Sequence, residues 1–389
     1  MKQIEKHQKI AILGFGLEGV STIAYLQKHG IQEITVFDKK DEKEFEPEAK
    51  QRMQDLRAAG VSFSCGPSYL DSLTDFDIII RSPGIRALDE KLVSLRQQGK
   101  IITTPTQIFL DACPCPVIGV TGTKGKGTTS SLIYEMLKRS GKDAYLGGNI
   151  GKPALDFLDS LTPQSIVILE MSSFQLQDIT KSPHIAVVLM ITSEHLDYHV
   201  DVAEYVEAKR NILAFQKQED FAVINRDYLA SHESDISTNG NVFYVSRERS
   251  CENGCYIKDD GVWLSRDGKE EKIIDTAKIL LRGKHNWENV CAAGMAATLA
   301  GVQKKAIAEV LTTFHGLEHR LEFVGEYNGV SYYDDSFATT PEPTIAAIES
   351  FTEPLILILG GSSKGADFSE LGKVISNKSN IKAIVGIDP

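Results

Sequence analysis

Short apolar runs alternate with stretches of helical periodicity along the whole chain. Near the N-terminus, residues 9–16 (KIAILGFG) and 34–38 (ITVFD) have the composition of buried strands, and residues 20–26 between them have an apolar helical pattern. Further strand-like runs follow at residues 76–84 and 100–105. Strands that alternate with helices predict a parallel sheet with helices on both faces. Residues 1–104 are therefore predicted to form a doubly wound α/β domain.

The same alternation continues in two later regions. Residues 105–317 are predicted to form a central α/β domain, with strands beginning near Val117 and at residues 166–171, 185–192 and 221–225. Residues 251–265 combine turn residues with β-type runs and predict a hairpin. A third α/β unit is predicted for residues 318–389, with strands near residues 330–333, 355–359 and 381–387. Because a unit of about seventy residues that ends after a strand lacks elements to cover a parallel sheet, we expect the sequence to be incomplete or unusually short at its C-terminal end.

A glycine-rich turn joins the strand near Val117 to a helix, in the sequence PVIGVTGTKGKGTTSSL. Such a turn aims backbone N–H groups and the positive end of the helix dipole at one point, which suits a phosphate. Lys126 adds a positive charge there, although Gly127 and then Thr128 follow it where the general phosphate-loop pattern has Ser or Thr directly after the lysine. An ATP loop is favoured over a turn that only closes a βα unit. Its residues are Gly122, Thr123, Lys124, Gly125, Lys126, Gly127, Thr128 and Thr129.

A second glycine motif, Gly14-x-Gly16-x-x-Gly19, ends the first strand, and Asp38 follows about twenty residues later. This spacing is typical of a loop that lets the backbone approach a pyrophosphate, with the carboxylate on a ribose. The motif could serve NAD, FAD or another nucleotide diphosphate, or it could be a structural tight turn. Residues 82–84 (SPG) end another strand, where open α/β sheets place their ligands.

Polar residues follow the central strands directly. Glu170 ends one strand, and because an unpaired buried carboxylate is costly, a metal or hydrogen-bonding role is favoured for it. His195 and His199 follow the next strand, but without an HExxH pattern a single histidine near Mg²⁺ is favoured over a zinc pair. Lys209, on a helical stretch, is either a solvated surface lysine or a functional one. Two amides at the start of a small-residue helix either cap it or contact a ligand: Asn286 and Asn289.

Composition narrows the classes of partner. A formal net charge of −11 argues against a broad nucleic-acid-binding surface. The longest apolar runs have the length of strands and the N-terminus has no apolar signal segment, so a cytoplasmic protein without a membrane partner is predicted. The six cysteines include no CxxC pair, and we predict neither a disulfide framework nor a zinc site.

In combination and order, several segments resemble the motifs of the Mur ligase family, ATP-dependent amide-forming enzymes of peptidoglycan precursor synthesis. These segments are TGTKGKGTT, EMSSFQL, SEHLDYH, GKHNWENVCAA, HRLEF and DDSFATTPE. GFGLEG and GGSSKGADFSEL most resemble the members that join glutamate to UDP-N-acetylmuramoyl-L-alanine. The resemblance implies a Rossmann-like UDP-sugar domain (1–104), a P-loop ATPase-like central domain (105–317) and a partial Rossmann-like glutamate-binding domain (318–389), which closes about a hinge near Leu317. We expect the protein to be a monomer.

The resemblance also implies a role for individual residues. ATP would convert the substrate carboxylate to an acyl phosphate that the amine of glutamate attacks, with two Mg²⁺ ions and a carbamate on Lys209. The implied catalytic residues are Lys126, Glu170, His195, Lys209 and Arg320. The implied metal-binding residues are Thr128, Glu170, His195 and Lys209. Further implied ATP contacts are Asn286, Asn289, Arg320 and Asp335. The implied UDP-sugar contacts are Gly14, Gly16, Leu17, Glu18, Asp38, Ser82, Gly84, Asn149, Ser172, Gln175 and His195. The implied glutamate contacts are Thr339 and Lys364.

Two departures leave alternatives open. Gly127 resembles the variant loop of folylpolyglutamate synthetases, which add glutamate by the same chemistry. Phe337 stands where the glutamate-adding members usually have a lysine, so either D- or L-glutamate could be the acceptor. A truncated copy that binds nucleotides without turnover is the alternative from another functional class.

Overall fold

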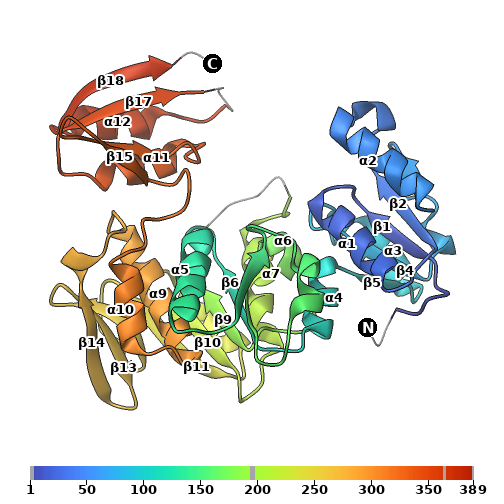
Figure 1. Cartoon of the computed structure of the whole chain (residues 1–389), viewed down its shortest axis with the longest axis horizontal. Coiled ribbons are helices and arrows are strands. Elements are labelled where there is room, and N and C mark those ends of the chain that lie inside the picture. The colour runs from blue at the N-terminus through green and yellow to red at the C-terminus, as the bar shows by residue number, and fades with distance from the viewer. Residues whose placement is uncertain (1–3, 193–197, 362–364, 388–389) are drawn as a thin grey trace. The chain divides into compact units, whose positions relative to one another are not determined.

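The protein, seen here as a computed structural model, is described for residues 4–192, 198–361 and 365–387 (Figure 1). The chain divides into two compact units. The first comprises Met1–Lys126 and Gly141–Phe243, and the second comprises Gly127–Ser140 and Tyr244–Pro389. The divisions after residues 104 and 317 that the sequence suggests stay predictions.

The first unit begins with a five-stranded parallel sheet in the order β3-β2-β1-β4-β5. Its strands are β1 (Ile10–Leu13), β2 (Ile34–Asp38), β3 (Ser62–Cys65), β4 (Ile78–Arg81) and β5 (Ile101–Thr103). Helices α1 (Leu17–Lys28), α2 (Pro47–Ala58) and α3 (Glu90–Gln97) connect them. β1 and β4 are buried along their whole length, as their continuous apolar runs require. The strand order reverses between β1 and β4, so the turns that follow these two strands meet where such sheets bind ligands.

The first unit continues with five parallel strands in the order β10-β9-β6-β8-β7. These are β6 (Val117–Thr121), β7 (Ala144–Gly148), β8 (Ile166–Glu170), β9 (Ile185–Val188) and β10 (Phe221–Asn225). The accompanying helices are α4 (Pro105–Ala112), α6 (Ser173–Leu176), α7 (Val202–Ala214) and α8 (Leu229–His232). β6 is fully buried between β8 and β9, so the carboxyl ends of these three strands lie side by side. Short 3-10 helices occupy Glu42–Glu44, Leu73–Asp75, Ala154–Asp156, Leu158–Ser160 and Glu233–Ser237.

The second unit holds the hairpin that the sequence predicts. Strands β12 (Gly254–Lys258) and β13 (Gly261–Arg266) pair antiparallel, and β14 (Lys269–Asp275) pairs with β13. Asp259 and Asp260 have φ values of 47° and 50°, which form the tight turn whose twist matches a two-residue hairpin. β11 (Asn241–Ser246), which runs across the division, pairs parallel to β12. The helices here are α5 (Lys126–Arg139), α9 (His285–Leu299), α10 (Lys304–Leu311) and the 3-10 helix Thr276–Lys278.

The last part of the second unit contains two small sheets (Figure 1). β15 (Glu322–Tyr327) and β16 (Val330–Asp334) form an antiparallel pair, whereas β17 (Leu355–Gly360) and β18 (Ile381–Ile387) are parallel. Helices α11 (Pro341–Glu349) and α12 (Ser369–Asn377) lie between these strands in the chain. The predicted strands near residues 330, 355 and 381 are therefore confirmed. Among the residues that the structure describes, no helix has the length and apolar character needed to cross a membrane.

Candidate functional site

The turns after β1 and β4 meet tightly, as the strand order predicts. A Cβ atom at Gly14 would lie 3.2 Å from the Cβ and Oγ atoms of Ser82, and one at Gly19 would lie 2.1 Å from the carbonyl oxygen of Gly14. Gly14 also has φ +96°, so its place requires glycine. Asp38 accepts the N–H of Phe15 at 2.8 Å, so this carboxylate fixes the glycine turn itself.

The side chain of Ser82 lies against this turn. Its Oγ is buried and has no hydrogen-bond partner among the residues that the structure describes. A buried hydroxyl without a partner costs on the order of 1–3 kcal/mol. The other predicted contacts, Gly16, Leu17 and Gly84, are exposed at the same turns. Open backbone around a buried, unsatisfied hydroxyl fits a ligand that carries hydrogen-bonding groups.

Glu18 lies in the first turn of α1 and lines a small cavity together with Gly148, Glu170 and Gln175. The Nε2 of Gln175 donates to the Oε1 of Glu18 at 3.2 Å. Burial raises the pKa of Glu18 to about 7, opposed by this hydrogen bond and reinforced by the negative charge of Asp156. Three predicted site residues from distant segments thus converge on one cavity.

The raised pKa of Glu18 predicts a pH-dependent stability. The folded state favours the protonated carboxyl, so the stabilisation is complete below pH about 4.5 and is lost as the pH rises through about 7. Glu18→Gln is expected to raise the free energy of unfolding at pH 8.5 by about 2–3 kcal/mol and to leave it unchanged near pH 4.5. Urea unfolding of the ligand-free protein at both pH values measures this, with the exposed Glu33→Gln as control. Equal gains at both pH values would contradict the assignment.

The ATP-loop residues lie at the carboxyl end of β6. A Cβ atom at Gly122 would lie 2.7 Å from the Cβ of Leu189, so the loop passes too close to its neighbour for any other residue. Lys126 begins α5, and its Nζ folds back to donate to the carbonyl oxygens of Gly122 at 2.9 Å and Thr123 at 3.1 Å. Gly127 and Thr128 follow in the first helical turn, and Thr129 is buried. The lysine is therefore held over the loop, as a phosphate contact requires.

Lys209 lies at the same loop, and its interpretation as a solvated surface lysine is wrong. The side chain projects from α7, is 2% exposed, and its Nζ donates to the carbonyl oxygen of Gly122 at 2.9 Å. Two ammonium groups, those of Lys126 and Lys209, thus share one carbonyl acceptor. Two ammonium groups at one carbonyl place positive charge at this end of the loop, which suits an anion such as a phosphate.

Glu170 ends β8 beside the ATP-loop strand, because it pairs in register with Val120 of β6. Its side chain is 6% exposed, and its Oε1 accepts from the Nδ2 of Asn149 at 2.7 Å. This hydrogen bond joins a predicted metal ligand to a predicted UDP-sugar contact. A buried carboxylate oriented by one amide fits a hard cation such as Mg²⁺.

The segment after β8 supplies Ser172 and Gln175. The two residues form a reciprocal cap on α6, in which the Ser172 Oγ accepts the Gln175 N–H at 3.3 Å and the Gln175 Oε1 accepts the Ser172 N–H at 3.0 Å. Ser172 is thereby a capping residue as well as a candidate contact. His199 is buried, with its Nε2 3.0 Å from the Ser173 Oγ. His195 and Lys364, both predicted site residues, lie outside the described residues.

In the second unit, the predicted adenine-side amides lie inside α9. Asn286 donates to the carbonyl oxygen of Arg282 at 2.7 Å, and Asn289 donates to the Oδ1 of Asn286 at 2.9 Å. Thr129 donates to Asn289 at 3.4 Å. The alternative that these amides cap the helix is wrong, because the N-cap residue is Lys284. They instead form a buried polar group against the helix that follows the ATP loop.

Arg320 and Asp335 also lie together in the second unit. The carboxylate of Asp335 accepts the N–H of Leu321 at 3.0 Å, and burial raises the pKa of Asp335 against the opposing effects of that bond and of the Arg320 charge. The guanidinium of Arg320 lies 5.5 Å from the ring centre of Phe337. The aromatic ring of Phe337 therefore contacts a residue that the resemblance predicts to bind the transferring phosphate. Thr339 is exposed two residues further on.

Three neighbouring groups beside Arg320 could offer ligand atoms to a metal: His319, Glu322 and Asp334. The Nδ1 of His319 lies 2.6 Å from the Oδ2 of Asp334, and this hydrogen bond raises the pKa of His319 and lowers that of Asp334. An exposed ion pair accounts for the arrangement without a metal.

Sequence reasoning missed one residue of this region, Arg81. It ends the otherwise apolar strand β4 and is completely buried, with hydrogen bonds to segments before and after the ATP loop. A charged residue at the end of an apolar strand is the sequence signal that identified Glu170. Arg81 has the same signal at the end of β4.

The family comparisons cover nearly the whole chain. Residues 8–104 match the Mur ligase MurD-like N-terminal domain, residues 120–297 match the Mur ligase middle domain, and residues 319–389 match the Mur ligase glutamate ligase domain. Among solved structures, MurF from Acinetobacter baumannii has a TM-score of 0.57 at 16% identity, covering 98% of this chain and 78% of that one. MurC from Thermotoga maritima has a TM-score of 0.55 at 17% identity, covering 98% and 91%. These two likenesses show the fold.

Curated relatives are more similar. The UDP-N-acetylmuramoylalanine–D-glutamate ligase of Acetivibrio thermocellus is 40% identical over 382 residues, which cover 98% of this chain and 80% of the relative. The enzyme of the same name from Symbiobacterium thermophilum is 36% identical over 388 residues, covering 99% of this chain and 84% of the relative. With family models along its length and relatives at this identity, the chain belongs to the Mur ligase family.

Proposed function

We propose that this protein is an ATP-dependent ligase that joins D-glutamate to UDP-N-acetylmuramoyl-L-alanine and forms ADP. The observation that carries the chemistry is the pair of ammonium groups, from Lys126 and Lys209, on the carbonyl of Gly122. The substrates follow from the names of the relatives that are 35–40% identical over nearly the whole chain. Both substrates and ATP are small molecules of the cytoplasm, where we propose that the protein acts as a monomer.

The chemistry accounts for the charges at the loop. A carboxylate does not react with an amine at neutral pH, so its oxygen first attacks the γ-phosphorus of ATP and ADP leaves. The amine of glutamate then attacks the carbonyl carbon of the acyl phosphate, loses a proton, and expels phosphate. Both steps gather negative charge, and fixed positive groups that neutralise it lower the barrier. Lys126 is proposed to bind the β- and γ-phosphates.

The proposed roles of the other residues follow the family pattern. Mg²⁺, when bound, neutralises phosphate charge, and Thr128, Glu170, His195 and a carbamate on Lys209 would hold two ions. Because an ammonium group has no lone pair, Lys209 fits this role only after carbamylation. Asn286, Asn289 and Asp335 are proposed to bind the nucleoside of ATP, and Arg320 the transferring phosphate. Gly14, Glu18, Asp38, Ser82, Asn149 and Gln175 are proposed to bind the UDP-sugar, and Thr339 and Lys364 glutamate.

The function is tested by phosphate release from ATP with UDP-N-acetylmuramoyl-L-alanine and either D- or L-glutamate. We expect release that requires the UDP-sugar and D-glutamate together. Release that requires L-glutamate would support the reaction and contradict D-glutamate as the acceptor. This outcome is worth testing because Phe337 stands where the resemblance leads us to expect a lysine. Binding of the UDP-sugar without release in either case would overturn the assignment as a ligase. Transfer of glutamate to a folate in place of the UDP-sugar would indicate the folylpolyglutamate synthetase alternative.

Phe337 supplies a further prediction. Its ring holds the guanidinium of Arg320, and an exposed cation–π contact is worth on the order of 0.5–1 kcal/mol. Phe337→Leu is therefore expected to lower the rate of phosphate release about threefold. Phe337→Tyr, which keeps the ring, serves as the control and should retain the rate. Equal losses in both variants would contradict a role for the ring face.

A further inference from the structure

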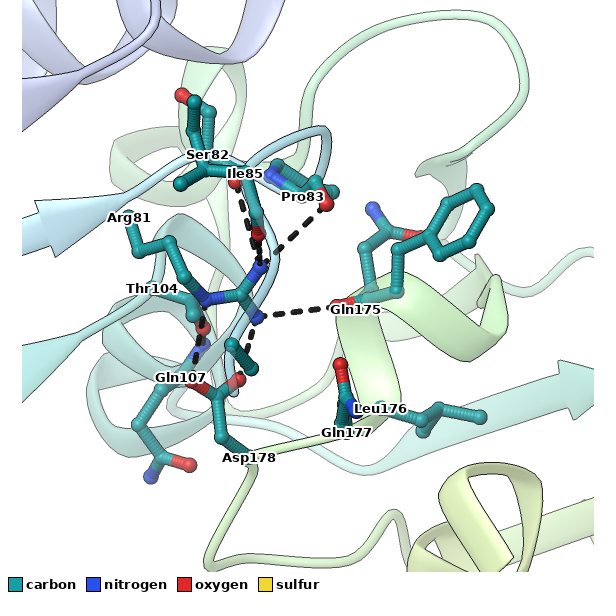
Figure 2. A network of polar contacts seen from close by, with 12 residues as sticks. Arg81, Ser82, Pro83, Ile85, Thr104, Gln107, Gln175, Leu176, Gln177 and Asp178 are labelled. Carbon is teal, nitrogen blue, oxygen red and sulfur yellow. Dashed lines mark hydrogen bonds and ion pairs between the residues drawn. The ribbon is translucent and has the colours of Figure 1, made fainter. Parts of the chain in front are cut away.

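Arg81 joins two segments that are far apart in the sequence (Figure 2). Toward the turn after β4, its Nη1 donates to the carbonyl oxygen of Ile85 at 2.5 Å, with longer contacts of 3.4 Å to those of Ser82 and Pro83. Toward the segment after β8, its Nη2 donates to the carbonyl oxygen of Phe174 at 3.1 Å. One planar guanidinium therefore lies between the two segments and bonds to both.

The charge of Arg81 is neutralised within this network. Asp178 accepts from the Nη2 of Arg81 at 2.7 Å and from its Nε at 3.2 Å, a bidentate pair. Arg96 donates to the same carboxylate at 2.9 Å. Because Arg81 is 0% exposed, loss of its bonds would leave buried acceptors without partners. The network is therefore a rigid connection between the segments.

Both connected segments carry proposed UDP-sugar contacts. The turn after β4 begins with Ser82, the residue next to Arg81, whose buried Oγ has no partner among the described residues. The segment after β8 contains Gln175, which lies in α6 directly after Phe174 and reaches Glu18. The position of each contact relative to the other thus depends on the backbone carbonyls that Arg81 holds.

We propose that Arg81 is a positioning residue for the UDP-sugar, holding the turn after β4 and the segment after β8 at the spacing that lets both contact one ligand. The inference rests on the proposed function, since that function names the ligand. A lysine cannot replace this arginine, because a single ammonium lacks the fork that reaches both segments and Asp178 together. Tyr198 adds a second donor to the same turn, its hydroxyl donating to the Ile85 carbonyl oxygen at 2.9 Å.

The test compares Arg81→Lys with Arg96→Lys in the full chain, using calorimetric titration with UDP-N-acetylmuramoyl-L-alanine and, separately, with ATP. Arg96 is the matched control because it binds the same carboxylate and otherwise donates to Ala87, outside both segments. For Arg81→Lys we expect the dissociation constant of the UDP-sugar to rise at least about tenfold and that of ATP to change less than about threefold. For Arg96→Lys we expect both to change less than about threefold.

Amide hydrogen exchange supplies a readout that general destabilisation would not reproduce. In Arg81→Lys, residues 82–86 and 173–178 should exchange faster together, while the strands of the five-stranded sheet stay protected. If Arg81→Lys does not fold, Tyr198→Phe decides the question, with an expected threefold to tenfold weaker binding of the UDP-sugar only.

The outcomes separate this inference from the function on which it rests. Failure of the wild-type protein to bind the UDP-sugar overturns the proposed function and the role of Arg81 with it. Binding by the wild type with equal affinity in Arg81→Lys, or with parallel losses for ATP, overturns only the role of Arg81. Faster exchange throughout the chain would likewise identify a residue that only stabilises the fold.

Discussion

Replacing Lys126 with alanine is expected to lower phosphate release from ATP at least about 10³-fold. The Nζ of Lys126 lies over the loop, within 2.9 Å of the Gly122 carbonyl oxygen and 3.1 Å of that of Thr123. Phosphoryl transfer depends mainly on fixed charges around the phosphate, and α5 contributes only its dipole once the lysine is gone. Initial rates at saturating ATP, UDP-sugar and glutamate measure the loss.

The control for this variant is Lys138→Ala. Lys138 lies in the last turn of the same helix and is exposed, so its removal changes the net charge equally without touching the loop. It should retain the wild-type rate within about twofold. If Lys126→Ala kept more than about a tenth of the wild-type rate, the loop would not bind the transferring phosphate.

Replacing Lys209 with alanine is expected to lower the rate of phosphate release at least about 10²-fold. The wild-type rate is expected to depend on CO₂, from which the proposed carbamate on Lys209 forms. The side chain is 2% exposed and donates to the same carbonyl as Lys126, so an unmodified ammonium places a second positive charge at this carbonyl. A carbamate would reverse the charge and supply oxygen ligands. The wild-type rate should therefore fall in bicarbonate-depleted buffer and recover when bicarbonate is added, whereas the residual rate of Lys209→Ala should not respond.

Two controls accompany this experiment. Lys217→Ala, which removes an exposed lysine just after α7, should behave as the wild type does. Thermal unfolding of Lys209→Ala shows whether the variant is folded at the assay temperature. A wild-type rate that is indifferent to bicarbonate would leave Lys209 as a structural ammonium and remove the carbamate from the proposal.

Elements with strong local signals could be predicted from the sequence. The continuous apolar runs of β1, β4, β6 and β8 specify buried strands, because strands covered on both faces have no polar alternation. Strands with weak local signals could not be predicted. β3 and β15 have half-buried or exposed positions and were not predicted, since their pairing depends on neighbouring strands more than on their own residues.

The residues of the site likewise divide into those that local sequence patterns predict and those whose contacts depend on distant segments. The two glycine turns and the placement of Glu170 at a strand end could be predicted from the sequence, because close backbone approach and abrupt polarity are properties of a few adjacent residues. The burial of Lys209 at the carbonyl of Gly122 could be seen only in the folded chain, as could the hydrogen bonds by which Arg81 joins residues 82–85 to residues 174–178. Burial and pairing of a charge depend on segments that are distant in the chain, so local patterns do not contain them.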